Sequence, residues 1–180
     1  ASDVYKRQTK NNKKDFIIEE GILLKDEIKV QSTRAKDKSP FAFSNISKND
    51  IERNNIGKDI PFLLEMTPSV YTTSDAGNGI GYTGVRIRGS DPTRINVTIN
   101  CIPYNDSESH GVFWVNLPDL ASSSNSIQVQ RGVGSSTNGG GAFGGTISIK
   151  TGKPSEKFSL NYSSSLGSYK TFKNDEKNEK

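Results

Sequence analysis

Glycine is concentrated in the second half of the chain, where it separates short apolar stretches from one another. Fourteen of the 17 glycines lie between Gly77 and Gly152. Glycine allows tight turns and close approach of backbones, and it loses more conformational freedom on folding than any other residue. This distribution predicts short elements joined by tight loops, with surrounding structure that holds the loops in place.

Apolar and polar residues alternate in four short segments of this region. These segments are residues 85–88, 95–101, 127–129 and 147–149. A period of two is the pattern of a strand with one buried and one polar face. The turn residues Gly89-Ser90-Asp91-Pro92 separate the first two segments. The sequence therefore predicts a four-stranded sheet.

Short helices are predicted by capping residues rather than by long amphipathic patterns. Ser47-Lys48-Asn49-Asp50 fits a capping box and predicts a helix over residues 48–54. Asp59 can cap a second helix, which Pro68 would end, and Asn116 can cap a third. Together with the strands, these helices predict the α+β fold class.

The charge distribution argues against nucleic-acid binding. The formal net charge is +4, but residues 85–152 hold only five basic and four acidic side chains. A phosphate-binding face needs a denser basic stripe than this. The chain also lacks an apolar run of about 18 residues, the length expected of a transmembrane helix.

Two glycine-rich motifs resemble nucleotide-binding loops, but their surroundings do not support that interpretation. Residues 79–84 fit the G-x-G-x-x-G pattern, which requires a strand before it and a helix after it. Here polar residues precede the motif and a predicted strand follows it. The glycine run at residues 138–145 lacks the Lys-Ser or Lys-Thr pair that holds phosphates. We therefore expect no cofactor.

The only histidine of the chain, His110, lies close in sequence to Asp106 and Glu108. A zinc site would require more ligands, and the chain offers no second histidine and only one cysteine, Cys101. A nucleophilic triad normally converges from separate segments, and no second catalytic group is identifiable. The pattern therefore indicates a polar, ligand-contacting loop, neither a metal site nor an enzyme.

Near the C-terminus, Phe158, Leu160 and Tyr162 alternate with polar residues. Strands of transmembrane β-barrels show this alternation, because one face meets lipid and the other meets the lumen. The segment predicts a barrel strand.

Three blocks of sequence, residues 59–70, 81–106 and 127–151, resemble the plug of TonB-dependent outer-membrane receptors, particularly those of Bacteroidetes. The blocks occur in the family's order, and the resemblance covers roughly residues 26–151. It implies an α+β plug domain with a four-stranded mixed sheet and short helices. The first strand of a truncated transmembrane β-barrel would follow at about residues 157–169.

The resemblance also implies a division of the chain into four parts. Residues 1–25 are similar to the end of a carboxypeptidase-regulatory-like domain, although we do not assign residues 1–8 to it. A TonB-box-like segment and linker would occupy residues 26–39. The plug would span residues 40–152, and the start of the barrel residues 153–180.

For function, the resemblance implies a plug that gates a barrel in the Gram-negative outer membrane. It would help to bind a scarce nutrient such as a siderophore, haem, cobalamin or glycan. The implied partners are TonB with the inner-membrane ExbB–ExbD complex, the chain's own C-terminal barrel and the nutrient ligand, without nucleic acid. A free-standing periplasmic ligand-binding module is the alternative, but it leaves the alternation after Pro154 unexplained.

By position, the resemblance assigns a TonB-coupling segment that would pair with a TonB strand through backbone hydrogen bonds. Its residues are Asp26, Glu27, Ile28, Lys29 and Val30. A plain linker strand is the alternative interpretation of the same residues.

The resemblance assigns two outward loops, residues 72–83 and 104–114, to substrate. The candidate substrate-facing residues are Asp75, Asn78, Tyr82, Asn105, Asp106, Glu108, His110 and Trp114. Arg88 and Arg131 match arginines that tend to face the barrel. Cys101 stands where the family usually has glycine, so the backbone of that turn is expected to differ slightly.

Overall fold

The computed structural model of the chain describes residues 34–134, 138, 140–153, 158–168, 170 and 172–179. The expected TonB-coupling segment therefore lies outside the described residues, as does the expected domain end at residues 1–25. The elements are β1 (Phe43–Ser47), α1 (Lys48–Asn54), α2 (Ile60–Leu63), β2 (Val70–Ser74), β3 (Thr83–Ile87), η1 (Pro92–Arg94), β4 (Ile95–Ile99), β5 (Ile102–Pro103), η2 (Trp114–Asn116), α3 (Leu120–Ser123), β6 (Ser124–Arg131), η4 (Gly140–Ala142), β7 (Gly145–Thr151), β8 (Ser159–Leu166) and β9 (Phe172–Glu179).

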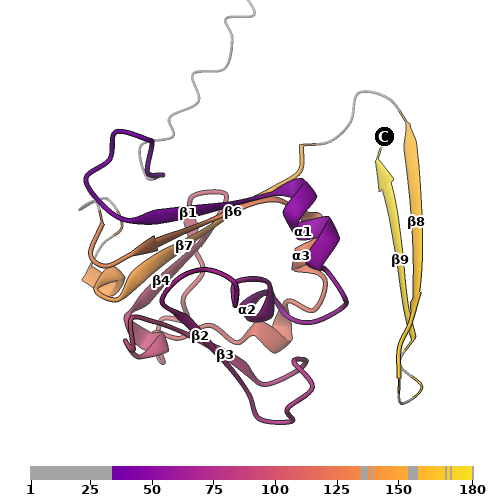
Figure 1. Cartoon of the computed structure of the whole chain (residues 1–180), viewed down its shortest axis with the longest axis horizontal. Coiled ribbons are helices and arrows are strands. Elements are labelled where there is room, and N and C mark those ends of the chain that lie inside the picture. Colours follow the sequence, from indigo (N-terminus) through magenta and orange to yellow (C-terminus); the bar gives the residue numbers. More distant parts are fainter. Residues whose placement is uncertain are drawn as a thin grey trace, which may run out of the picture. The chain divides into compact units, whose positions relative to one another are not determined.

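The main sheet has the strand order β1-β6-β7-β4-β5 (Figure 1). Strands β4 and β7 run parallel, whereas the other neighbours are antiparallel. This mixed sheet with short helices confirms the predicted α+β class. The sheet has five strands rather than the four expected from sequence, because the edge strands β1 and β5 pair through backbone bonds without an apolar alternation of their own.

One of the four expected strands lies outside the main sheet. Residues 85–88 contribute to β3, which pairs with β2 in a separate two-stranded sheet. The alternation correctly identified Val85 and Ile87 as buried residues. It did not identify their partner strand, since β2 is largely polar and was not expected to be a strand.

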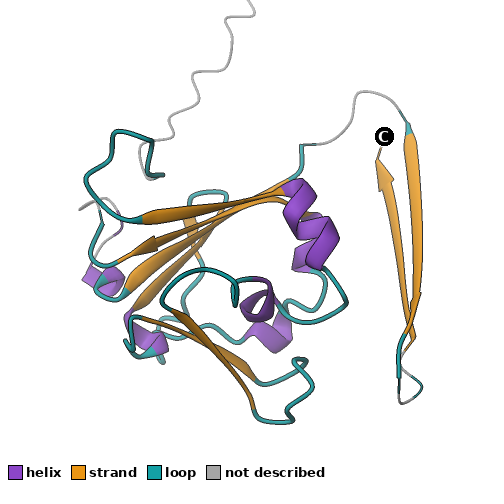
Figure 2. Ribbon diagram, viewed as in Figure 1, coloured by secondary structure: helices purple, strands orange, loops and turns teal. Residues whose placement is uncertain are grey.

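The apolar core lies on one side of the main sheet. The register places Ile147 directly beside Val129 on β6 and Val97 on β4, and it places Ile149 beside Ile127. Helices α1, α2 and α3 and the β2–β3 pair all cover this side, as Figures 1 and 2 show. Each fully buried aliphatic side chain stabilises the fold by roughly 1.5–3 kcal/mol through removal of apolar surface from water.

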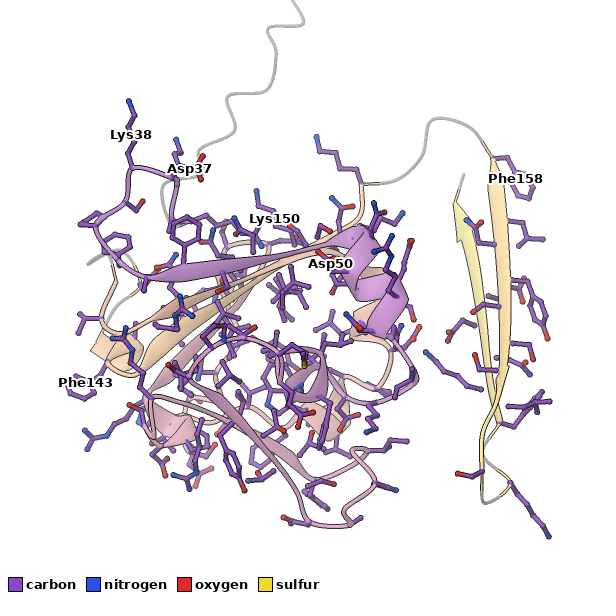
Figure 3. All side chains as sticks on the ribbon, in the orientation of Figure 1. Asp37, Lys38, Asp50, Phe143, Lys150 and Phe158 are labelled. Carbon is purple, nitrogen blue, oxygen red and sulfur yellow. The ribbon has the colours of Figure 1, made fainter. Side chains whose placement is uncertain are left out.

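The other side of the main sheet is polar, although it is also buried. Gln128 lies beside Ser148, and Gln130 lies beside Thr146, and all four residues are almost inaccessible. Lys150 lies two residues after Ser148 in β7 and therefore on the same face of the sheet. In Figure 3 its side chain projects from the upper side of the sheet. Hydrogen bonds rather than apolar contacts therefore hold this face.

The capping box predicted for the first helix is confirmed. The Asp50 backbone N–H donates to Ser47 Oγ over 3.4 Å, and the Ser47 N–H donates to Asp50 Oδ2 over 3.1 Å. Ser47 Oγ also donates to Asp50 Oδ2 over 2.6 Å, and this bond first, then the bond from the Ser47 N–H, holds the pKa of Asp50 below its usual range. The third helix differs from the prediction, because Asn116 ends η2 and Asp119 occupies the N-cap position of α3.

Strands β8 and β9 form a separate antiparallel hairpin. Strand β8 falls within the expected segment, and its apolar residues Leu160, Tyr162 and Leu166 are exposed on one face. Among the described residues, none of the helices is both long and apolar enough to cross a membrane.

Candidate functional site

The first expected substrate loop connects β2 to β3 and is held by a buried carboxylate. Asp59 Oδ2 accepts hydrogen bonds from the Gly81 N–H over 3.1 Å and from Thr83 Oγ1 over 2.8 Å. The Asp59 N–H in turn donates to the Gly79 carbonyl oxygen over 3.0 Å. Asp59 is only 3% exposed, so these bonds are shielded from water. The loop is therefore fixed at its base to the start of α2.

Sequence reasoning assigned Asp59 a different role. It was expected to cap the second helix, and it does occupy the N-cap position of α2, but its side chain makes no capping hydrogen bond. The carboxylate bonds the loop that lies more than twenty residues further along the chain instead. No local pattern could reveal that partner.

The G-x-G-x-x-G motif forms the end of this loop. Gly79 and Gly81 have φ angles of 81° and 95°, which residues with a side chain rarely adopt. Strand β2 precedes the loop and strand β3 follows it, so the helix that a dinucleotide-binding motif requires is replaced by a strand. The glycines form the turn between the two strands, and the strand predicted after the motif is confirmed.

The second expected loop is tied to β4 by Asn105. Its Oδ1 accepts from the Val97 N–H over 2.7 Å, and its Nδ2 donates to the carbonyl oxygens of Ile95 and His110, each over 2.9 Å. The side chain of Asn105 thus extends the hydrogen bonding of the sheet into the loop. Asn105 therefore has a structural role in the loop.

Asp106 organises the tip of the second loop. Its Oδ2 accepts from the backbone N–H and the Oγ of Ser109, over 2.7 and 2.8 Å, and from the Glu108 N–H over 3.2 Å. These bonds, first the backbone bond from Ser109, keep the pKa of Asp106 below its usual range. The loop therefore retains an ionised carboxylate at its centre, with Glu108 and His110 exposed around it.

The two loops meet at a shallow hollow of about 150 Å³. Asp75 and Tyr82 line it from the first loop, and Phe113 and Trp114 line it from the second. The structure thus brings together three of the expected substrate-facing residues, Asp75, Tyr82 and Trp114. The remaining five, Asn78, Asn105, Asp106, Glu108 and His110, do not line this hollow.

Trp114 lies at the floor of this region rather than on its surface. It is 3% exposed and belongs to the hydrophobic core, whereas the neighbouring Phe113 is half exposed. A tryptophan has a large apolar surface, and packing Trp114, the first residue of η2, into the core removes that surface from water. The expectation of an outward-facing Trp114 is therefore corrected, and the neighbouring Phe113 is the exposed aromatic residue.

The two arginines expected to face the barrel differ from each other. Arg131 donates to the carbonyl oxygens of Pro68 and Phe43, over 3.2 and 3.4 Å, and so connects β6 to two other segments. Arg88 is exposed and adopts a φ of 52° at the end of β3. Among the described residues, no group of three or more His, Cys, Asp or Glu side chains is arranged to hold a metal ion.

Comparison with known families agrees with this architecture. The family model of the TonB-dependent Receptor Plug Domain matches residues 35–146, which is more than half of the chain. The chain therefore belongs to the TonB-dependent receptor plug domain family. Because this family is one of receptors, the expectation that the chain is not an enzyme is confirmed. No curated protein sequence matches the chain.

Solved structures show the same fold. The siderophore receptor PirA from Acinetobacter baumannii matches 72% of this chain at 24% identity with a TM-score of 0.53. The alcaligin outer-membrane receptor FauA from Bordetella pertussis matches 77% at 17% identity with a TM-score of 0.58. FpvA from P. aeruginosa, solved with bound pyoverdines, matches 76% at 15% identity with a TM-score of 0.57. The matches cover 20%, 23% and 17% of those longer chains.

Proposed function

We propose that the chain is the plug of an outer-membrane receptor that takes up a scarce nutrient with energy delivered through TonB. The observation that carries this proposal is the family match across residues 35–146, which spans the main sheet up to β7 and both loops. In this role the plug closes a surrounding barrel and offers its loops to ligand. The proton-motive force, transmitted by TonB and the ExbB–ExbD complex, would drive the opening.

The proposed ligand surface consists of exposed residues around the hollow. Tyr82 and Phe113 supply aromatic surface, and Asp75 supplies a carboxylate beside them. Aromatic and hydrogen-bonding groups around a concavity are the usual elements of a small-molecule site. The remaining exposed candidates from the two loops are Asn78, Asp106, Glu108 and His110. Since PirA is described as a siderophore receptor, a siderophore is the first ligand to test, ahead of haem, cobalamin or a glycan.

We further propose that β8 is the first strand of the barrel. One face carries Leu160, Tyr162 and Leu166, and the exposed Phe158 lies just before the strand (Figure 3). The opposite face is polar, as a lumen-facing side requires. Strand β9 lacks this pattern, since the residue beside Tyr162 on the same face is Glu176. The proposal therefore applies to β8 alone.

The coupling role of Asp26–Val30 is a separate proposal about residues outside the described part of the chain. A purified TonB C-terminal domain would be titrated against a peptide covering residues 23–36 and followed by backbone amide shifts. Saturable shifts centred on residues 26–30, lost in an Ile28→Pro peptide, are expected, because proline removes a donor that strand pairing needs. Absence of shifts at millimolar peptide would exclude these residues as the coupling segment.

A further inference from the structure

The hollow between the two loops is too small for a whole drug-sized ligand. Its volume is about 150 Å³, whereas pockets that hold drug-sized molecules usually measure about 300–1,000 Å³. The exposed rings of Tyr82 and Phe113 border its opening, and the buried Trp114 closes its floor. The hollow can therefore admit a narrow arm of a ligand while the body of the ligand stays outside it.

Asp75 gives the hollow its charge. Among the described residues that line the hollow, Asp75 is the one acidic residue, and none is Lys, Arg or His. The Asp75 N–H donates to the Tyr82 carbonyl oxygen over 3.1 Å, so the two residues face each other across the base of the first loop. A carboxylate beside open space attracts a ligand group of positive charge and repels one of negative charge.

The aromatic rings at the opening favour the same sign of charge. Tyr82 is 69% exposed and Phe113 is 50% exposed, so both rings are accessible to a ligand. An aromatic ring is negative on its face and attracts a cation that lies within about 6 Å of its centre. The rings and the carboxylate therefore select for one kind of group, an organic cation on an apolar stem.

The two loops as a whole lack the residues with which proteins bind anions. Residues 72–83 and 104–114 contain no Lys or Arg, although the chain has 24 of them. Recognition of carboxylate or phosphate groups normally uses the guanidinium of Arg or the ammonium of Lys. The acidic residues of the two loops are all exposed, and they are Asp75, Asp106 and Glu108. A strongly anionic ligand would therefore be repelled at this surface.

Basic residues flank the first loop in sequence, but they are directed at other groups. Arg86 Nη1 lies 3.9 Å from Asp91 Oδ2. Lys58 Nζ lies 5.1 Å from the centre of the Phe62 ring. Neither Arg86 nor Lys58 lines the hollow. The hollow therefore keeps its negative charge in a chain whose formal net charge is +4.

We propose that the hollow receives a positively charged arm of the ligand, such as an alkylammonium group, and that the ligand as a whole is neutral or cationic. The inference rests on the proposed function, because it takes the two loops as the ligand surface. In the complex, Asp75 pairs with the ammonium group, and the rings of Tyr82 and Phe113 contact it. A ferric trihydroxamate with an amino arm has this chemistry, since three hydroxamates neutralise Fe³⁺. A ferric tris-catecholate is strongly anionic and does not.

The test is a titration of the isotope-labelled 180-residue chain with three complexes of one linear trihydroxamate, followed by backbone amide shifts. Diamagnetic Ga³⁺ replaces Fe³⁺ in all three. The terminal amine is free, acetylated or succinylated, so the total charge is positive, neutral or negative on the same chelate. At low salt we expect acetylation to raise Kd roughly five- to tenfold, because the ion pair and the ring contacts are lost. Succinylation should raise Kd further.

Substitutions then assign the preference to the hollow. Asp75→Asn should bring the Kd values of the amino and acetylated complexes to within about threefold, since only the ring contacts remain. Asp75→Lys should reverse the order of the three complexes. Tyr82→Leu keeps an apolar side chain without the ring and should weaken the preference independently of Asp75. The matched control is Asp37→Asn, which removes an exposed carboxylate outside both loops (Figure 3) and should leave the preference unchanged.

Salt provides a further check, because screening weakens contacts between charges. The preference for the amino complex should shrink between about 10 mM and 1 M salt, as the Debye length falls from roughly 30 Å to 3 Å. A preference that is the same at both salt concentrations would overturn the proposed role of Asp75.

Equal affinity for the three complexes, or tightest binding of the succinylated one, would overturn this inference but leave the loops as a ligand surface. The same holds for a preference that Asp75→Asn and Tyr82→Leu both leave unchanged. Amide shifts from none of the complexes at millimolar concentration would overturn the inference together with the proposed ligand surface. TonB is absent from these titrations, so the coupling role of residues 26–30 is decided separately by the peptide experiment.

Discussion

The two faces of the main sheet are equally buried but are held by different forces. On one face, Ile147, Ile149 and Ile127 pack against helices and the β2–β3 pair. On the other, Gln128 and Ser148 bind Arg34 and Ala35 through hydrogen bonds. Apolar burial scales with area, whereas a hydrogen bond contributes about 0.5–1.5 kcal/mol net, and about 1.5–3 kcal/mol where the donor is charged, as in Arg34. One sheet therefore combines an apolar core on one face with a hydrogen-bonded polar layer on the other.

The largest expected effect is on the apolar face. Ile147→Ala removes a side chain that is 0% exposed and lies between Val97 and Val129. We expect the free energy of unfolding to fall by about 2–5 kcal/mol, because a cavity is left in addition to the lost burial. Urea denaturation measures this. Ile102→Ala, at an exposed position, is the control, and a comparable loss there would contradict the assignment of the core.

The second prediction concerns Gly145, where the backbone of β7 approaches its neighbours closely. A Cβ at this position would lie 2.6 Å from the Gln130 carbonyl oxygen and 2.9 Å from Ile87 Cδ1. Gly145→Ala is expected to destabilise the chain by about 1–3 kcal/mol, since the backbone or the core must shift. Gly141→Ala meets nothing within 4 Å and serves as control in the same urea measurement. Equal stability of the two variants would refute this packing.

The third prediction concerns the polar face, where removal of a side-chain hydroxyl is expected to preserve or raise the free energy of unfolding. Thr146 Oγ1 is buried and has no hydrogen-bond partner. Thr146→Val keeps the shape and removes the unsatisfied hydroxyl, so the free energy of unfolding should be unchanged or rise by up to about 1 kcal/mol. Ser148→Ala, which deletes an acceptor of Arg34, should lower it. A clear loss of stability in Thr146→Val would show that the hydroxyl has a partner.

The smallest effect lies outside both faces, in the loop around Asp106. Because the pKa of Asp106 is depressed by its bonds from Ser109 and Glu108, its contribution is present above the unfolded pKa and is lost as pH falls through the lower folded pKa. Carboxyl chemical shifts should report that midpoint below the usual aspartate range. Ser109→Ala should raise it part of the way, and the sheet should show no matching transition. An unchanged midpoint in Ser109→Ala would exclude this cause.

Sequence patterns predicted the elements of this fold better than their arrangement. The capping box identified α1, and the alternation identified the buried residues of β3, β4, β6 and β7. The edge strand β1 and the polar strand β2 were missed, because strand pairing uses backbone groups that every residue carries. The same limit explains why β3 was assigned to the wrong sheet.

In the candidate site, too, the segments were predictable from sequence but their contacts were not. The two loops were predicted from the family resemblance, and the structure brings them to one hollow. The bonds by which Asn105 and Asp106 organise the second loop were not predictable from sequence. Trp114 was likewise expected outside, because an aromatic residue in a polar loop looks exposed in sequence.

The sequence by itself determined where this chain turns, where its short helices begin and which residues alternate into a core, since these depend on neighbours a few residues apart. The tertiary structure alone decided the partners of Asp59, Trp114 and Arg34. Arg34 and Ser148 are 114 positions apart, and Arg34 also bonds Ser126. One side chain can reach both serines because the sheet places β6 and β7 side by side. Long-range polar contacts leave no periodic pattern in the sequence, so they can be identified only from the folded structure.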